Sequence, residues 1–310
     1  MPPANRKNPV HAASSDSDYT LGEFMREFPD DDACLLWLWR NRYSPDDVHA
    51  ACPKCDQPRE FKKYTTAQQR QSWTCIGCGH HIHPTAGTIF AKSSTSLHLW
   101  FYAMYLMTST RCGISAKQLE RELGVTYKTA WRIANLIRSE LMTYEGAEFA
   151  EKVEMDETYV GGKRKADKPG RPGPDSHKTP VFGIADRKGH IVALTVPNVR
   201  QRTLLPIIRQ YVIPATTIYT DEFASYNRLA AKGYAHKHVT HSAGVYVSGD
   251  IHVNTVEGFW SLVKRGIDGV YHSVSRKHLQ GYVNEYAWRY NNRGGQKAQF
   301  ALLLLRAVGS

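Results

Sequence analysis

The sequence lacks any long hydrophobic segment. No uninterrupted apolar run approaches the roughly 20 residues that a helix needs to cross a bilayer. The N-terminal stretch Met-Pro-Pro-Ala-Asn-Arg-Lys-Asn also lacks the apolar core of a signal peptide. We therefore expect neither a membrane protein nor a secreted one, and the cytoplasm is the expected location.

Acidic residues are fewer than basic ones. The 310 residues include 29 Asp and Glu against 40 Lys and Arg, which gives a formal net charge of +11. An excess of cations favours a polyanionic partner, because lysines and arginines that neutralise phosphates release counterions. Nucleic acid is the expected partner, although charge alone is equally compatible with a merely basic protein. The hydrophobic content of 42% excludes a disordered chain and can fill the cores of two or three domains.

Cysteine is scarce, and four of the six cysteines form two Cys-x-x-Cys pairs. The pairs are Cys52/Cys55 and Cys75/Cys78, separated by 19 residues that read as strands. This spacing is typical of a zinc ribbon, in which two thiolate pairs complete a tetrahedron around one structural Zn²⁺. A redox pair or disulfides would need a different context or compartment. His80, His81 and His83 are competing ligands of lower rank, because four cysteines already saturate such a site.

The N-terminal half divides into three predicted parts. Residues 1–18 are polar and without periodicity, so we expect a flexible tail. Residues 19–92 form a helical lead-in followed by the zinc ribbon, and residues 93–145 are predicted to be helical. Within the last part, a helix ending at Gly124 and a second one capped by Thr126 give the layout of a helix-turn-helix. An ordinary helical hairpin would show the same pattern; on the second helix, Lys128 and Arg132 favour DNA binding.

Residues 150–305 are predicted to form a mixed α/β domain that begins with strands. The expected order is strand 153–161, hairpin 181–197, helix 202–211, strand 217–220, helix 224–232 and strand 236–241. Three consecutive strands that then meet a helix are typical of a ribonuclease-H-like fold. The predicted fold class is therefore α/β, a ribonuclease-H-like mixed sheet with flanking helices.

Three acidic residues recur in order along this region. They are Asp156 on the first strand, Asp221 at the end of the fourth, and Glu257 on a later helix. Three carboxylates that meet at one point cannot all stay ionised unless cations neutralise them, and oxygen ligands favour Mg²⁺ or Mn²⁺. Two such ions per site would suit phosphoryl transfer. Lys264 follows Glu257 by two helical turns and shares its face, and Asn254 precedes it by three residues.

The chain resembles a known family on specific motifs. It is similar to the zinc-ribbon insertion-sequence transposases with a DDE-type domain, the insertion-sequence fifteen-ninety-five family, from about Leu21 to Arg293. The motifs that carry the resemblance are Cys-Pro-Lys-Cys at 52–55, Thr-Ala-Gly-Thr-Ile-Phe at 85–90, Ser-Ala-Lys-Gln-Leu at 115–119, Lys-Thr-Ala-Trp at 128–131, Asp-Glu-Thr-Tyr-Val-Gly-Gly-Lys at 156–163, Asp-Glu-Phe-Ala-Ser-Tyr at 221–226, His-Val-Asn-Thr-Val-Glu-Gly-Phe-Trp-Ser-Leu-Val-Lys at 252–264 and Arg-Tyr-Asn-Asn-Arg at 289–293.

The resemblance implies a DNA transposase that binds terminal inverted repeats, cleaves the ends of its element and joins them to target DNA. Asp156, Asp221 and Glu257 match the catalytic acids, with Asn254 as a supplementary ligand or a neighbour of Glu257. The residues expected to contact DNA are Lys264, Arg265, Lys128, Arg132 and Lys163. Because two element ends must be joined, a homodimer or higher assembly is expected, associated with the nucleoid if the source is bacterial.

Two other functions fit parts of the pattern. A simple nuclease of the same fold would need the acids but neither of the upstream binding modules. A domesticated, catalytically silent DNA-binding protein would need the modules but not the acids. The presence of both sets favours the transposase.

Overall fold

The structure is a computed structural model that describes residues 19–65, 71–110, 112–146, 148–161, 178–221, 226, 229–238, 253–295 and 297–309. Its contacts divide the chain into two compact units. The first comprises residues up to 111, 116–141 and 293 onward, and the second comprises 112–115 and 142–292. Among the described residues, no helix is both long and apolar enough to span a membrane.

The first unit is built on helices that pack through aromatic side chains. Helix α1 (Leu21–Glu27) begins with a capping box between Thr20 and Glu23, and Asp30 caps α2 (Asp31–Arg42). Helices α3 (Leu97–Ser109) and α9 (Gln299–Gly309) complete the group. Ring contacts join α1, α3 and α9 through Phe24, Phe28, Tyr105 and Phe300. The predicted domain boundaries differ here, because residues 293–305 were expected with the catalytic domain and α9 packs in the first unit.

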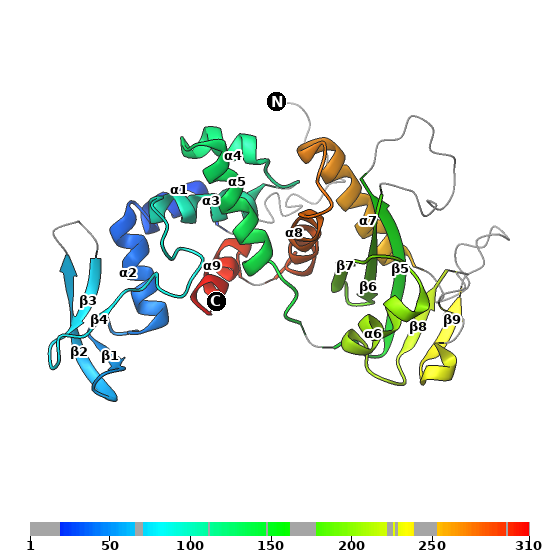
Figure 1. Cartoon of the computed structure of the whole chain (residues 1–310), viewed down its shortest axis with the longest axis horizontal. Helices are drawn as coiled ribbons and strands as arrows, with labels where there is room; N and C mark the ends of the chain where they lie inside the picture. The colour runs from blue at the N-terminus through cyan, green and yellow to red at the C-terminus, as the bar shows by residue number, and fades with distance from the viewer. Residues whose placement is uncertain are drawn as a thin grey trace, which may run out of the picture. The chain divides into compact units, whose positions relative to one another are not determined.

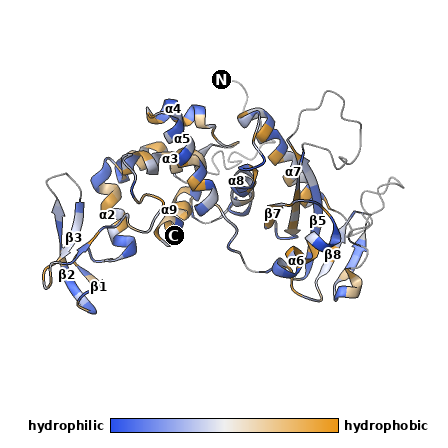
Figure 2. Ribbon diagram, viewed as in Figure 1, coloured by the Kyte–Doolittle hydropathy of each residue, from blue (hydrophilic) through white to orange (hydrophobic). Residues whose placement is uncertain are grey.

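A small antiparallel sheet follows α2. Its strands β1 (His49–Cys52), β2 (Gln57–Thr65), β3 (Gln71–Cys75) and β4 (His81–Ile82) pair in chain order. The rings of Trp39 and Trp73 stack with their centroids 4.8 Å apart, and Phe61 packs beside them. Most of β2 is exposed, and Figure 2 shows it as hydrophilic. The sheet therefore has little apolar core of its own.

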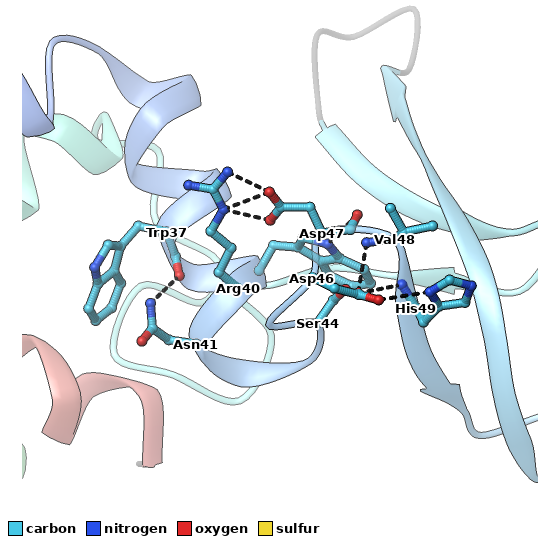
Figure 3. A network of polar contacts seen from close by, with 9 residues as sticks. Trp37, Arg40, Asn41, Ser44, Asp46, Asp47, Val48 and His49 are labelled. Atoms are coloured by element: carbon cyan, nitrogen blue, oxygen red, sulfur yellow. Dashed lines mark hydrogen bonds and ion pairs between the residues drawn. The ribbon is translucent and has the colours of Figure 1, made fainter.

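The connection from α2 to β1 is held by a carboxylate (Figure 3). Asp46 accepts hydrogen bonds from the backbone N–H groups of His49 and Val48, from the Ser44 hydroxyl, and pairs with the His49 imidazole. These bonds, the His49 N–H first, lower the pKa of Asp46 below its usual range. The neighbouring Asp47 pairs with Arg40 of α2. The small sheet is thus tied to the helix that precedes it.

The predicted helix-turn-helix consists of α4 (Ala116–Leu123) and α5 (Tyr127–Leu136). Gly124 has a φ of +63°, as expected of a glycine that ends a helix, and the Thr126 side chain accepts a hydrogen bond from the Thr129 N–H. The second helix was expected to continue to Leu141. Its last turn is instead the π-helix η1 (Ile137–Leu141).

The second unit contains a five-stranded mixed sheet in the order β7-β6-β5-β8-β9. Strands β5 (Lys152–Val160), β6 (Thr179–Asp186) and β7 (Ile191–Thr195) are antiparallel neighbours. Strands β8 (Thr217–Thr220) and β9 (Ala235–His238) run parallel to β5. An antiparallel triplet extended by parallel strands on the side of its first strand is the ribonuclease-H-like arrangement, so the predicted fold class is confirmed.

Helices cover both faces of this sheet (Figure 1). Helix α6 (Gln201–Tyr211) packs on one face against Val153, Met155 and Ile184. Helices α7 (Asn254–Gly266), continued by the π-helix η5 (Ile267–Tyr271), and α8 (Leu279–Asn291) pack on the other. Because side chains alternate along a strand, Glu154 and Asp156 face α7 while Met155 faces α6.

One predicted helix differs. Residues 224–232 were expected to be helical, and their described part contains only the 3-10 helix η3 (Ala230–Lys232), closed by Gly233 at a φ of +90°. Residues 224, 225, 227 and 228 of that segment lie outside the described residues, as do the predicted tail 1–18 and the basic loop that contains Lys163.

Candidate active site

The parallel pairing of β5 with β8 brings together the segments that carry two of the three predicted acids. Val153 pairs with Ile218 and Glu154 with Tyr219. Asp156 follows Glu154 by two residues, and Asp221 follows Tyr219 by two residues. Both acids therefore lie toward the same end of the two strands, with Asp221 directly after the last residue of β8.

Helix α7 supplies the third acid. Glu257 lies in its first turn, and Trp260 and Lys264 follow at intervals of three and four residues, so the three side chains share one face. This face borders a groove of about 740 Å³. The residues that line the groove are Asp156, Glu157, Thr158, Glu257, Trp260, Ser261, Lys264, Arg265, Asp268 and Gly269.

Trp260 connects the helix directly to Asp156. Its indole N–H donates a hydrogen bond to Oδ2 of Asp156 over 3.0 Å. The ring lies against Gly183 of β6, which is the register partner of Asp156. A Cβ atom at position 183 would stand 2.6 Å from Cζ2 of Trp260, so only glycine lets the ring lie flat on the strand at this point.

The three carboxylates interact electrostatically. Burial, then the charges of Asp221 and of Glu257, raise the pKa of Asp156 from its ordinary value of 3.8 to about 7. The Trp260 N–H and Lys264 oppose this rise. Asp221 does not line the groove, yet its charge acts on Asp156 more strongly than that of Glu257. A cluster that disfavours its own ionisation is suited to bind a cation, and oxygen donors suit Mg²⁺ or Mn²⁺.

The raised pKa of Asp156, caused by burial first and by the neighbouring charges second, gives a pH-dependent stability in the absence of divalent cations. The pKa of Asp156 in the folded protein lies above its unfolded value. The contribution of this carboxyl group to the stability of the protein is therefore largest below pH 4 and is lost as the pH rises through 7. The full loss corresponds to at most about 4 kcal/mol. In denaturant titrations with chelator between pH 5.5 and 8, we expect Asp156→Asn to flatten the profile and to exceed the parent protein in stability at pH 8. An unchanged slope would contradict this assignment.

The close approach of Trp260 to Gly183 predicts a second effect on stability. Gly183→Ala should displace the indole and cost about 1–3 kcal/mol of unfolding free energy, as overpacking typically does. Gly258→Ala on α7 is the matched control, because a Cβ there meets no atom within 4 Å. In a helix interior, alanine should stabilise by up to about 1 kcal/mol. Equal midpoints in urea for both variants would show that the ring tolerates a side chain at position 183.

The four paired cysteines of the first unit form a separate candidate metal site. The ligand atoms of Cys52, Cys55, Cys75 and Cys78 all lie within 4.8 Å of one another. The Cys52 and Cys78 sulfurs are 3.6 Å apart, and those of Cys55 and Cys75 are 4.0 Å apart. Four thiolates at about 2.3 Å from a tetrahedral zinc ion would be separated by about 3.8 Å. The cluster could therefore hold zinc, as the ribbon spacing predicts.

Comparison with known proteins places the second unit in a family. A model of the ISXO2-like transposase domain matches residues 148–291. An uncharacterised protein in transposable element ISH50 of Halobacterium salinarum is 31% identical over 255 residues, which span 77% of this chain and 84% of the relative. The chain belongs to the ISXO2-like transposases. This is the insertion-sequence family that the sequence motifs indicate.

Two further similarities were found, one to a sequence relative and one to a solved structure. An uncharacterised transposase-like protein of Haemophilus influenzae is 33% identical over 123 residues, covering 40% of this chain and 98% of that protein. Among solved structures, a paired-end complex of the Mos1 transposase with its left transposon end matches with a TM-score of 0.30 and 13% identity, over 67% of this chain and 74% of that one. The family assignment rests on the sequence relatives.

The basic residues that the sequence selects in this transposase are exposed wherever they are described. Lys264 and Arg265 line the groove beside Glu257. Lys128 and Arg132 lie one turn apart on the exposed side of α5. Lys163 lies outside the described residues, so its role stays a prediction.

Asn254 is the first residue of α7, and it is exposed and absent from the groove lining. Glu257, the predicted third acid, lines the groove together with Asp156 and Trp260.

Two features of the transposase site were not predicted from the sequence. Trp260 lies within the motif at 252–264, but its hydrogen bond to Asp156 was not expected. Gly183 was not predicted to matter, because the space that a side chain there would need is filled by Trp260, from a helix more than 70 residues later. The three-residue spacing of Glu257 and Trp260 was the available signal for Trp260, since it places the ring on the same helix face as the predicted acid.

Proposed function

We propose that this transposase binds the terminal inverted repeats of its element, cleaves the element's ends in a metal-dependent reaction and joins them to target DNA. The observation that carries the proposal is that Asp156 and Glu257 line one groove and that the charge of Asp221 also acts on Asp156. Phosphodiester transfer through bound cations needs such a set of converging carboxylates.

The proposed roles follow from the positions of the side chains. Asp156, Asp221 and Glu257 would hold two Mg²⁺ or Mn²⁺ ions, which lower the pKa of an attacking water or hydroxyl and stabilise the leaving oxygen. Trp260 holds the Asp156 carboxylate in one orientation through its N–H. Lys264 and Arg265, on the next turns of α7, are suited to contact the phosphates of the DNA backbone.

The first unit is proposed to bind DNA through the helix-turn-helix and the zinc ribbon. The exposed side chains of Lys128 and Arg132 would face phosphates or bases, and one Zn²⁺ would hold the ribbon together. We propose a homodimer or higher assembly that holds two ends of the element, acting in the cytoplasm on nucleoid DNA if the source is bacterial.

The decisive experiment incubates the full chain with DNA that carries the element's inverted repeats and with Mg²⁺ or Mn²⁺. Separation of nicked, excised and joined products on denaturing gels should show cleavage at the repeats and joined molecules, both abolished by a chelator. DNA with a scrambled repeat is the matched control. Cleavage of both DNAs without joining would favour the simple nuclease, and binding of the repeat without cleavage would favour the silent DNA-binding protein.

A further inference from the structure

The beginning of α7 is held by a buried carboxylate from another element. Glu154 of β5 is completely buried, and its Oε2 accepts hydrogen bonds from the N–H groups of Thr255 (2.8 Å) and Val256 (3.2 Å). Its Oε1 accepts a third, from the Thr255 hydroxyl, over 2.8 Å. Helix α7 has no capping side chain at its own N-cap residue, Val253. Glu154 therefore satisfies the free N–H groups of the helix from outside, where a negative charge also complements the helix dipole.

An arginine balances this buried charge and extends the network to β8. Nη1 of Arg187, in the turn between β6 and β7, lies 2.8 Å from Oε1 of Glu154. The same guanidinium stands 4.8 Å from the ring centroid of Tyr219. A buried carboxylate with three hydrogen-bond donors and a paired cation is strongly held, whereas removal of one partner leaves the others without compensation.

Three residues of this network each lie two positions before one of the candidate acids. Glu154 precedes Asp156 by two residues on the same face of β5. Tyr219 is the register partner of Glu154 and precedes Asp221 by two residues. Thr255 precedes Glu257 by two residues at the start of α7. On β5, on β8 and on α7, the network thus contacts the residue that lies two positions before the candidate acid.

We propose that Glu154 is a positioning residue, which sets α7 on the sheet so that Glu257 lies beside Asp156. It acts on Glu257 through the backbone of Thr255 and Val256. The proposal rests on the proposed function, because Glu257 matters only if the three acids bind cations.

A purely structural role would also make Glu154 important, so the test needs a matched buried pair. Glu285 of α8 is equally buried, pairs with Arg289 at 3.0 Å and accepts a hydrogen bond from the Tyr271 hydroxyl at 2.9 Å. Glu285→Ala removes the same kind of buried ion pair from the same unit, but it leaves the contacts of Thr255 and Val256 in place.

The experiment titrates Mn²⁺ into the zinc-loaded full chain by calorimetry. Replacing residues that orient metal ligands typically weakens metal binding 10- to 100-fold, so we expect Glu154→Ala to raise the Kd for Mn²⁺ at least about tenfold. Glu154→Gln should raise this Kd only about threefold, because the amide oxygen of glutamine still accepts hydrogen bonds from the N–H groups of the helix. Some loss is expected because the amide nitrogen cannot pair with Arg187. Glu285→Ala should stay within about twofold of the parent protein. Equal effects of Glu154→Ala and Glu285→Ala would overturn the proposal.

Hydrogen exchange gives a readout without metal. In Glu154→Ala, the amides of Thr255 and Val256 should exchange at least about tenfold faster, and in Glu285→Ala they should not change. Unchanged exchange in Glu154→Ala would refute the anchoring of α7. Glu257→Ala distinguishes the proposed function from the positioning role. Unaltered Mn²⁺ binding in Glu257→Ala would refute the proposed function of Glu257. Lost binding in Glu257→Ala together with intact binding in Glu154→Ala would refute only the positioning role of Glu154.

Discussion

Asp221→Asn is expected to reduce metal-dependent cleavage of element ends by at least about a thousandfold. The amide keeps the size of the side chain and removes the charge that faces Asp156. A bound cation contributes several kcal/mol of transition-state stabilisation, and about 4 kcal/mol corresponds to a thousandfold change in rate. Rates of nicking and joining on repeat-bearing DNA measure the effect. Binding of the same DNA without divalent cations should be unchanged, because Lys128, Arg132 and the ribbon lie outside the acid cluster.

A carboxylate at the other end of the sheet provides the control for this variant. Asp186 closes β6, where it pairs with His190 and accepts the His190 N–H, and its register partner is Val153 rather than Asp156. Asp186→Asn should therefore cleave at nearly the parental rate. Strand transfer that persists in Asp221→Asn would contradict the assignment of Asp221 as a catalytic acid, and an equal loss in Asp186→Asn would indicate a general effect of charge on the domain.

Loss of the zinc ribbon is the second large effect expected. Cys55→Ser should release Zn²⁺ and unfold the sheet β1–β4, because this sheet buries only a small cluster around Trp39, Phe61 and Trp73. Small domains of this size usually need a metal or a disulfide to fold. Binding of zinc to such sites contributes roughly 10–16 kcal/mol at neutral pH, far more than the small cluster can supply.

Zinc content and tryptophan fluorescence measure this outcome. The stacked rings of Trp39 and Trp73 should separate when the metal leaves, which shifts the emission to longer wavelengths. Cys112→Ser is the matched control, since this cysteine is exposed and lies outside the cluster. Retained zinc and an unchanged melting profile in Cys55→Ser would rule out the four-cysteine site.

Local patterns in the sequence predicted most of the elements correctly. Thr220 ends the fourth strand of the second unit as predicted, and the predicted cap at Thr126 begins its helix. These features depend on near neighbours, so the sequence contains the information directly. The two π-helical turns and the 3-10 turn at 230–232 were not predicted, because tertiary packing sets the local geometry there.

The sequence by itself determined the family, the cysteine pairs, the order of the three acids and the excess of positive charge. Each of these is a matter of residue type and spacing along one chain. Only the tertiary structure decided that α9 joins the N-terminal helices, that Gly183 makes room for Trp260, and that Glu154 holds the start of α7. These contacts join residues about 75 to 280 positions apart, and no periodicity or local propensity records which distant side chain a folded sheet brings near.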